Sequence, residues 1–351
     1  MSKGTKVIAL ISLILILSGS LLFLSGRFWK KSLYPAKLEP LRVMESARTP
    51  YFLPQYLALS LGFFREQGLE VRISTTSPEA IRAALADGRT DVALCGLQKS
   101  VFSPLKTDSR PLAFARITRF DGSYLLARED IENFQWAGVK DKTVIGGQQD
   151  YSAQIILEEV LRRNGLSPTR DVTVYHNIPE ALRVGAFRAG TGNFLQLGEP
   201  EASLAEKRSY GRIVASVGEA AGEMPVTVYS SNRVYYESHL ESIQKFTNGL
   251  DKALRWLKEH SPAEAAEAAA PFFPNLDKEV LLSSVERYQT HRIWTDEPSI
   301  DRESFSRFLT AVKNSGELVS PVSYEESVVI IPPRYEATEQ QEKKRKWWNR
   351  S

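Results

Sequence analysis

The chain has 351 residues, of which 42% are hydrophobic and 25% charged, and these proportions are ordinary for a globular protein. Its net charge of +3 arises at the ends, because residues 1–31 and 336–351 together hold ten Lys or Arg and three Glu side chains. The 35 basic and 39 acidic residues left between 32 and 335 make a mildly acidic body, which argues against nucleic acid as a partner. A single cysteine, Cys95, excludes an intrachain disulfide and a cysteine metal site.

The N-terminal residues 1–31 contain an almost wholly apolar run from Val7 to Leu24, preceded by Lys3 and Lys6. A run of this length predicts a membrane segment, either an anchor or a signal peptide. No Ala-x-Ala cleavage site and no cysteine for lipidation follows it, which favours an uncleaved anchor. We therefore expect a domain outside the cytoplasm, tethered to the cell membrane by an N-terminal helix, or secreted or periplasmic if the segment is cleaved.

The first part of the folded body begins after residues 32–40, which hold two prolines and indicate a linker. Leu41 to Met44 predict a strand, and Tyr51 to Phe64 predict a helix with an apolar stripe. Thr49 is a suitable N-cap for that helix, and Pro50 takes its first position.

A repeated pattern organises the centre of the chain. Residues 78–96 predict a short helix, a glycine turn and a buried strand, and residues 179–198 show the same order. Pro78-Glu-Ala-Ile-Arg82 matches Pro179-Glu-Ala-Leu-Arg183 almost residue for residue. A unit present only twice is not a solenoid. Unless two βαβ units match by chance, it predicts two α/β lobes of one plan with a cleft between them.

Two chain crossings between the lobes follow from the strand pattern. The apolar runs at 112–115 and 123–127 predict strands that make the first crossing, and 143–147 opens the second lobe as a strand. A helix follows at 148–164, and the strand at 225–229 predicts the return crossing.

The remaining chain is helical in pattern and is expected to close back over the first lobe. The predicted helices lie within 243–257, 263–270, 281–288 and 305–312. The predicted organisation is a first lobe of two pieces, 41–122 and 228–330, a second lobe at 123–227, and a disordered basic tail at 336–351. That tail either solubilises the chain or contacts an anionic membrane surface.

Motifs that carry catalysis or cofactor binding are absent from the sequence. The four histidines lack metal-ligand spacing, and no HExxH, GxSxG or phosphate loop occurs. We therefore expect no metal, no cofactor and no enzymatic activity.

Six short motifs occur in order between Leu41 and Tyr324: Tyr56-Leu-Ala-Leu-Ser-Leu-Gly-Phe-Phe64, Gln67-Gly-Leu-Glu-Val71, Ala84-Leu-Ala-Asp-Gly-Arg-Thr-Asp91, Gly165-Leu166, Asp171-Val172 and Gly198-Glu-Pro200. Together they resemble the solute-binding proteins of ABC importers in the NMT1/THI5-like and SsuA-like group, which includes sulfonate, taurine, nitrate and thiamine-pyrimidine binders. The resemblance implies an α/β, two-lobed periplasmic-binding-protein-like fold (type II), in which each lobe is a mixed sheet flanked by helices and two strands cross between them.

Two departures from that group are visible. The chain lacks the lipidated cysteine that members on Gram-positive cells carry, and Gly190-Thr-Gly-Asn193 replaces a Gly-x-x-Asp pattern. The resemblance also implies partners: a small-molecule solute, a permease and an ATPase subunit, with the binding protein itself a monomer.

Ligand-binding residues are predicted from position, because loops at the carboxyl ends of strands face the cleft in such folds. The predicted residues are Ser46, Arg48, Thr49, Tyr51, Phe52 and Gln98 of the first lobe, Phe120 and Tyr124 near the first crossing, and Gln148, Asp150, Tyr151, Ser152 and Glu199 of the second lobe. Arg48 could pair an anionic group, or could be a solvated loop charge. Tyr51, Phe52 and Tyr151 could enclose a planar ring, although Phe52 suits helix packing equally well.

The resulting hypothesis is a membrane-tethered binding protein that captures a small molecule for an importer. The solute would be a heteroaromatic vitamin precursor such as a pyrimidine, or a sulfonate-type anion. Two alternatives remain open: an enzyme on the same fold, similar to a pyrimidine synthase that uses histidine and pyridoxal phosphate, and the sensing domain of a receptor.

Overall fold

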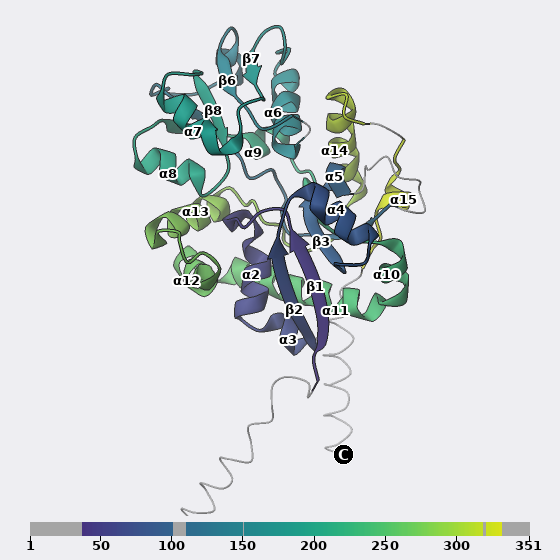
Figure 1. Cartoon of the computed structure of the whole chain (residues 1–351). Helices are drawn as coiled ribbons and strands as arrows, with labels where there is room; N and C mark the ends of the chain where they lie inside the picture. The colour runs from purple at the N-terminus through teal and green to yellow at the C-terminus, as the bar shows by residue number, and fades with distance from the viewer. Residues whose placement is uncertain (1–36, 101–109, 150, 319–320, 332–351) are drawn as a thin grey trace, which may run out of the picture.

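The computed structural model describes most of the chain and shows two lobes, one above the other in Figure 1. The described residues are 37–100, 110–149, 151–318 and 321–331. The predicted membrane segment at 1–31 and the predicted tail at 336–351 lie outside them. Within the described part of the chain, no helix has the length and apolar character needed to cross a membrane.

The first lobe is built on a five-stranded sheet with the order β2-β1-β3-β10-β4. Its strands are β1 (Glu39–Glu45), β2 (Leu69–Thr75), β3 (Val92–Gly96), β4 (Leu112–Arg116) and β10 (Thr227–Ser231). β1 runs parallel to β2 and β3, whereas β10 is antiparallel to β3 and β4. β1 begins at Glu39, so the linker predicted at 32–40 ends too late.

The second lobe repeats this plan in a sheet with the order β7-β6-β8-β5-β9. Its strands are β5 (Tyr124–Ala127), β6 (Thr143–Ile145), β7 (Thr173–Tyr175), β8 (Phe194–Leu197) and β9 (Arg212–Ser216). β6 is parallel to β7 and β8, and β5 is antiparallel to β8 and β9. The predicted fold of two lobes, each with a mixed sheet, is confirmed.

The sequence repeat corresponds to one helix in each lobe. α4 (Pro78–Ala86) precedes β3 and α7 (Glu180–Arg188) precedes β8. After each helix the chain turns at a glycine of positive φ, Gly88 at 68° and Gly190 at 104°. A side chain is strained in that region of backbone conformation, which explains why glycine occupies the turn in both copies.

The helix predicted at 51–64 is three shorter pieces. Thr49 caps a 3-10 turn, η1 (Pro50–Phe52), by accepting a hydrogen bond from the Tyr51 amide, as predicted. α2 (Leu53–Ser60) follows, and α3 (Phe63–Glu66) starts after Gly62. Gly62 has φ of 79°, and this left-handed residue interrupts a pattern whose apolar spacing is continuous.

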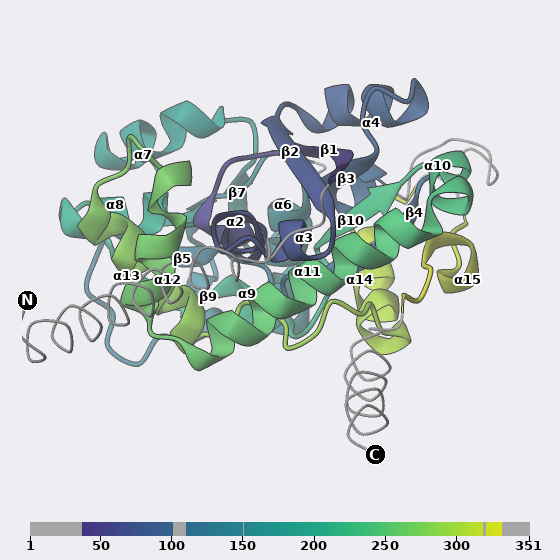
Figure 2. The same ribbon diagram turned by 90° about the horizontal axis from the view of Figure 1, so that it is seen from below.

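Further helices cover the two sheets. They are α5 (Leu97–Ser100), η3 (Trp136–Val139), α6 (Ser152–Arg163), α8 (Glu201–Lys207), α9 (Val217–Ala221), α10 (Arg233–Ser238), α11 (Leu240–Glu259), α12 (Pro262–Ala269), η4 (Ala270–Phe272), α13 (Lys278–Thr290), α14 (Arg302–Asn314) and α15 (Tyr324–Ser327). Figure 2 shows α11 running diagonally across the first lobe, where it packs on α2 and α3.

The C-terminal helices are not confined to the first lobe, contrary to expectation. α13 contacts α8 and α14 contacts α6, and both contacted helices belong to the second lobe. In Figure 1 α14 stands beside α6. Phe308 of α14 shares one buried apolar cluster with Ile156 of α6 and Val228 of β10. The last third of the chain therefore holds the two lobes against each other.

Candidate functional site

A cavity of about 670 Å³ lies between the two lobes. The segments that follow β1, β3, β6 and β8 contribute to its wall, so the carboxyl ends of strands from both lobes face it, as such folds require. Nine of the predicted residues line it: Ser46, Arg48, Thr49, Tyr51, Phe52, Gln98, Tyr151, Ser152 and Glu199. Their contact with a ligand stays a prediction.

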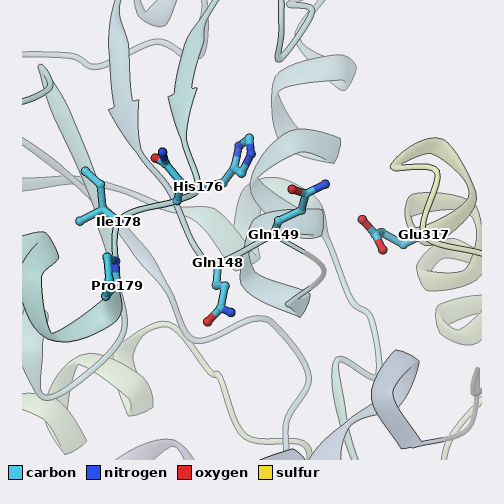
Figure 3. A pocket seen from close by; sticks show the side chains of 7 residues that line it. Gln148, Gln149, His176, Ile178, Pro179 and Glu317 are labelled. Atoms are coloured by element: carbon cyan, nitrogen blue, oxygen red, sulfur yellow. The ribbon is translucent and has the colours of Figure 1, made fainter. Parts of the chain in front are cut away.

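Gln148 is placed elsewhere. It lines a second cavity of about 610 Å³ at the edge of the second lobe, together with Gln149, His176 and Glu317 among others. Figure 3 shows Gln149 and His176 on neighbouring segments, with Glu317 facing them from the chain beyond α14. Gln148 and Gln149 line this second cavity, whereas Tyr151 and Ser152, at the start of α6, line the interlobe one.

Two further predicted residues, Tyr124 and Phe120, do not reach the interlobe cavity. Tyr124 is fully buried and stacks on Tyr288, with ring centroids 6.1 Å apart. Phe120 packs against the core, and only its carbonyl has a part in the site, by accepting from the Tyr51 hydroxyl at 2.7 Å. Position near a crossing does not determine which way a side chain turns. Asp150, the last predicted residue, lies outside the described residues.

Direct hydrogen bonds join the lobes across the cavity. Thr49 Oγ1 donates to the Glu199 carbonyl at 2.9 Å, and Ser152 Oγ donates to Gln98 Oε1 at 2.7 Å. Tyr288 of α13 adds a bridge, because its hydroxyl accepts from the Glu199 amide and donates to the Gly122 carbonyl. The lobes are therefore in a closed arrangement.

Arg48 forms an ion pair with a carboxylate of its own lobe. Its Nε lies 3.0 Å from Oε1 of Glu45, a fully buried residue at the end of β1. That carboxylate also accepts from the Tyr56 hydroxyl at 2.6 Å and from Thr75 Oγ1 at 2.7 Å. Burial, followed by the charge of Glu45, raises the pKa of Tyr56. Arg48 thus compensates an internal negative charge, which weakens the hypothesis that it pairs an anionic ligand.

Glu199 likewise turns its carboxylate inward. Its oxygens accept from the Ser203 amide and hydroxyl, each at 3.0 Å, from Ser284 Oγ at 3.2 Å and from Arg287 Nε at 2.8 Å. Its side chain has no exposed surface. Only the backbone of Glu199 is available to the cavity, and the carboxylate instead ties α8 to α13.

Aromatic rings face the cavity from both lobes. Tyr51 is held by ring contacts with Phe52, at 5.7 Å, and with Tyr288, at 6.0 Å, and burial raises the pKa of its hydroxyl. Lys99 Nζ lies 5.1 Å from the centre of the Tyr151 ring, a cation–π contact across the cleft. Phe52 is only 3% exposed, so a ligand would meet Tyr51 more readily than Phe52.

Sequence reasoning missed several wall residues, notably Asp121, Arg183, Thr227 and Tyr288. Asp121 is buried, its carboxylate accepts from the Ser123 amide at 2.9 Å, and burial raises its pKa. Arg183 matches Arg82 in the sequence repeat, but the match does not predict that Arg183 is buried while Arg82 is only half-buried. Tyr288 comes from a helix distant in sequence and had no local signal.

Solved structures similar to this chain share its fold. The alkanesulfonate-binding protein SsuA of Xanthomonas axonopodis pv. citri, bound to MOPS, aligns with a TM-score of 0.65 at 19% identity, covering 84% of this chain and 100% of that one. The nitrate-binding protein NrtA of Synechocystis PCC 6803 aligns with a TM-score of 0.60 at 14% identity, covering 84% and 85%. At these identities the likeness shows the periplasmic-binding-protein-like fold alone.

Relatives with similar sequences show the family to which this chain belongs. The "Putative binding protein YtlA" of Bacillus subtilis is 34% identical over 294 residues, which cover 83% of this chain and 88% of the relative. A Saccharomyces cerevisiae 4-amino-5-hydroxymethyl-2-methylpyrimidine phosphate synthase, THI13, is 24% identical over 274 residues, 70% of this chain and 77% of the relative. The family model described as "NMT1/THI5 like" matches residues 49–265, and this chain belongs to that family.

Proposed function

We propose that this chain is the extracytoplasmic solute-binding protein of an ABC importer, tethered by its N-terminal segment, which captures a small molecule and passes it to a permease driven by an ATPase. The observation that carries the proposal is the interlobe cavity, whose wall is shared by two lobes joined through Thr49–Glu199 and Gln98–Ser152. The similarity to a curated binding protein and the fold of sulfonate- and nitrate-binding proteins support it.

The cavity favours a solute of modest size. Its volume of about 670 Å³ lies within the range usual for small-molecule sites. Tyr51 and Tyr151 present rings from opposite lobes, which favours a ring-bearing solute such as a pyrimidine or another vitamin precursor. A sulfonate-type anion is the second solute class that the wall residues suit.

An enzyme is the second candidate function, because yeast relatives are pyrimidine phosphate synthases. All four histidines fall within the described residues, and none of them lines the interlobe cavity. His176 borders the second cavity, and His291 contacts Glu219 at 2.9 Å. This placement favours binding over a reaction that uses an active-site histidine. Incubation with pyridoxal phosphate, followed by mass spectrometry for a pyrimidine product, tests the enzyme directly.

Solute binding is tested by thermal unfolding of the full chain in detergent, against pyrimidines, aromatic sulfonates and nitrate. A ligand at a hundred times its dissociation constant stabilises a protein by about 2.7 kcal/mol, which raises the midpoint by several degrees. Ala153 is half-buried on the cavity wall, so Ala153→Trp should fill the cavity and abolish the shift. Ala181 is exposed on α7 and off that wall, so Ala181→Trp is the matched control.

A shift that survives in Ala153→Trp would place binding outside the interlobe cavity and contradict the proposal. A pyrimidine product would favour the enzyme. A shift lost in Ala153→Trp and kept in Ala181→Trp is the expected result.

A further inference from the structure

Arg183 is a buried cation on the wall of the interlobe cavity. It lies on α7 of the second lobe and is only 9% exposed. Its Nε donates to the Ile178 carbonyl at 3.1 Å, which anchors the base of the guanidinium group. The two terminal nitrogens make no hydrogen bond to any described residue, yet neither is sealed from solvent. The guanidinium is therefore fixed at one end and open at the other.

No described carboxylate lies within ion-pair distance of Arg183. Glu180, one turn earlier on the same helix, favours the charged form only from a distance, and burial lowers the pKa of Arg183 overall. The two other arginines near the site differ, because Arg48 pairs with Glu45 and Arg287 pairs with Glu199 and Glu206. Glu180 and Glu201 also line the cavity, but neither forms an ion pair with Arg183. Buried charges are normally paired, so the guanidinium of Arg183 is left without a direct charge partner among the described residues.

The internal repeat shows that this burial is particular to the second lobe. Arg82 holds the matching position on α4 of the first lobe, where it is half-buried and does not line the cavity. A helix of this plan therefore packs on its sheet without placing an arginine in the cleft.

We propose that Arg183 binds an anionic oxygen group of the solute, a carboxylate or a sulfonate, so that the solute is a ring-bearing or similarly compact acid rather than a neutral molecule. A planar guanidinium presents parallel N–H donors that match two oxygens of such a group. The anion would bind to the second lobe through Arg183, while Tyr51 of the first lobe contacts the body of the solute. This inference rests on the proposed function and adds the charge of the solute to it.

The test compares acids with their neutral amides, using the full chain in detergent and calorimetry. The probes are benzenesulfonate with benzenesulfonamide, and benzoate with benzamide. The wild type should bind each acid at least tenfold more tightly than its amide. Arg183→Gln should lower affinity for the acids by about 10- to 100-fold, as expected for loss of charge-assisted hydrogen bonds, and leave the amides unchanged. Arg183→Lys should keep part of the preference.

Arg188 provides the control on the same helix. It is exposed, packs over the Tyr210 ring at 4.5 Å and lies off the cavity wall, so Arg188→Gln should bind as the wild type does. Amides that bind as tightly as acids, or a preference that survives in Arg183→Gln, would overturn the inference and leave the proposed function intact. Failure of both acids to bind at millimolar concentration would also overturn it. The comparison of Ala153→Trp with Ala181→Trp would then test the proposed function independently of the charge of the solute.

Discussion

The ion pair between Glu199 and Arg287 should behave as a coupled unit that holds the second lobe to α13. Arg287→Met removes the guanidinium whose Nε lies 2.8 Å from Glu199 Oε1, and whose Nη2 lies 2.7 Å from Glu206 Oε2. Glu199→Gln removes the buried negative charge and keeps the shape of the side chain. The two changes and their combination form a double-mutant cycle.

The magnitude follows from the burial of the two partners. Glu199 has no exposed side-chain surface, whereas Arg287 keeps 22%. Removal of one partner from a fully buried pair costs about 3–5 kcal/mol, because the other charge is left uncompensated. Ser203 and Ser284 still donate to the carboxylate, and Arg287 is partly solvated, so we expect about 2–3 kcal/mol for Arg287→Met. Glu199→Gln should cost about 1–2 kcal/mol, since Glu206 remains beside Arg287.

Urea unfolding followed by circular dichroism measures these free energies. The double variant should be more stable than the sum of the single losses predicts, by about 1–2 kcal/mol, because the second change removes a charge that the first had already left unpaired. Additive losses, within about 0.5 kcal/mol, would show that the two side chains do not interact energetically and would refute the reasoning.

Two further predictions concern the cleft itself. Gly96→Ala would place a Cβ 2.8 Å from Ser152 Oγ and 2.9 Å from Gln98 Oε1, both on movable side chains, so the hydrogen bond between the lobes should be lost with little change in unfolding midpoint. Solute affinity should fall by about 2- to 10-fold, as for one lost hydrogen bond, and an unchanged affinity would contradict this. Asp121→Asn tests a buried acid whose pKa is raised, so the stability that Asp121 contributes is present below its unfolded pKa of about 4 and is lost as pH rises through the folded pKa. The variant should match the wild type in thermal midpoint near pH 3.5 and exceed it at pH 7, whereas a pH-independent difference would count against burial as the cause.

The local pattern was a good guide to the elements and to the plan of the lobes. The repeat at 78–96 and 179–198 corresponds to α4–β3 and α7–β8, and two sheets of matching order carry it. These elements follow from apolar period, caps and glycine turns, all of which are local. The prediction of one helix over 51–64 was wrong, because the apolar spacing continues through Gly62 whereas the left-handed backbone of Gly62 interrupts the helix after α2.

The site was predictable only as far as the carboxyl ends of the strands. Nine of the predicted residues line the interlobe cavity because chain direction within a parallel sheet decides which loops face it. The charges on Arg48 and Glu199 were visible in the sequence, but their partners Glu45 and Arg287 were not assignable, since an ion pair depends on two segments meeting in space.

Chain order and local periodicity were thus sufficient to establish two similar α/β lobes and the edge at which they face each other. Packing alone determined which polar groups remain open to a ligand. α13 and α14 contact helices of the second lobe, and Tyr288 of α13 lines the interlobe cavity. Arg183 is buried without an ion-pair partner, whereas Arg82, at the matching position of the repeat, is only half-buried. Burial and charge compensation arise from contacts between segments distant along the chain, and no pattern of neighbouring residues specifies them.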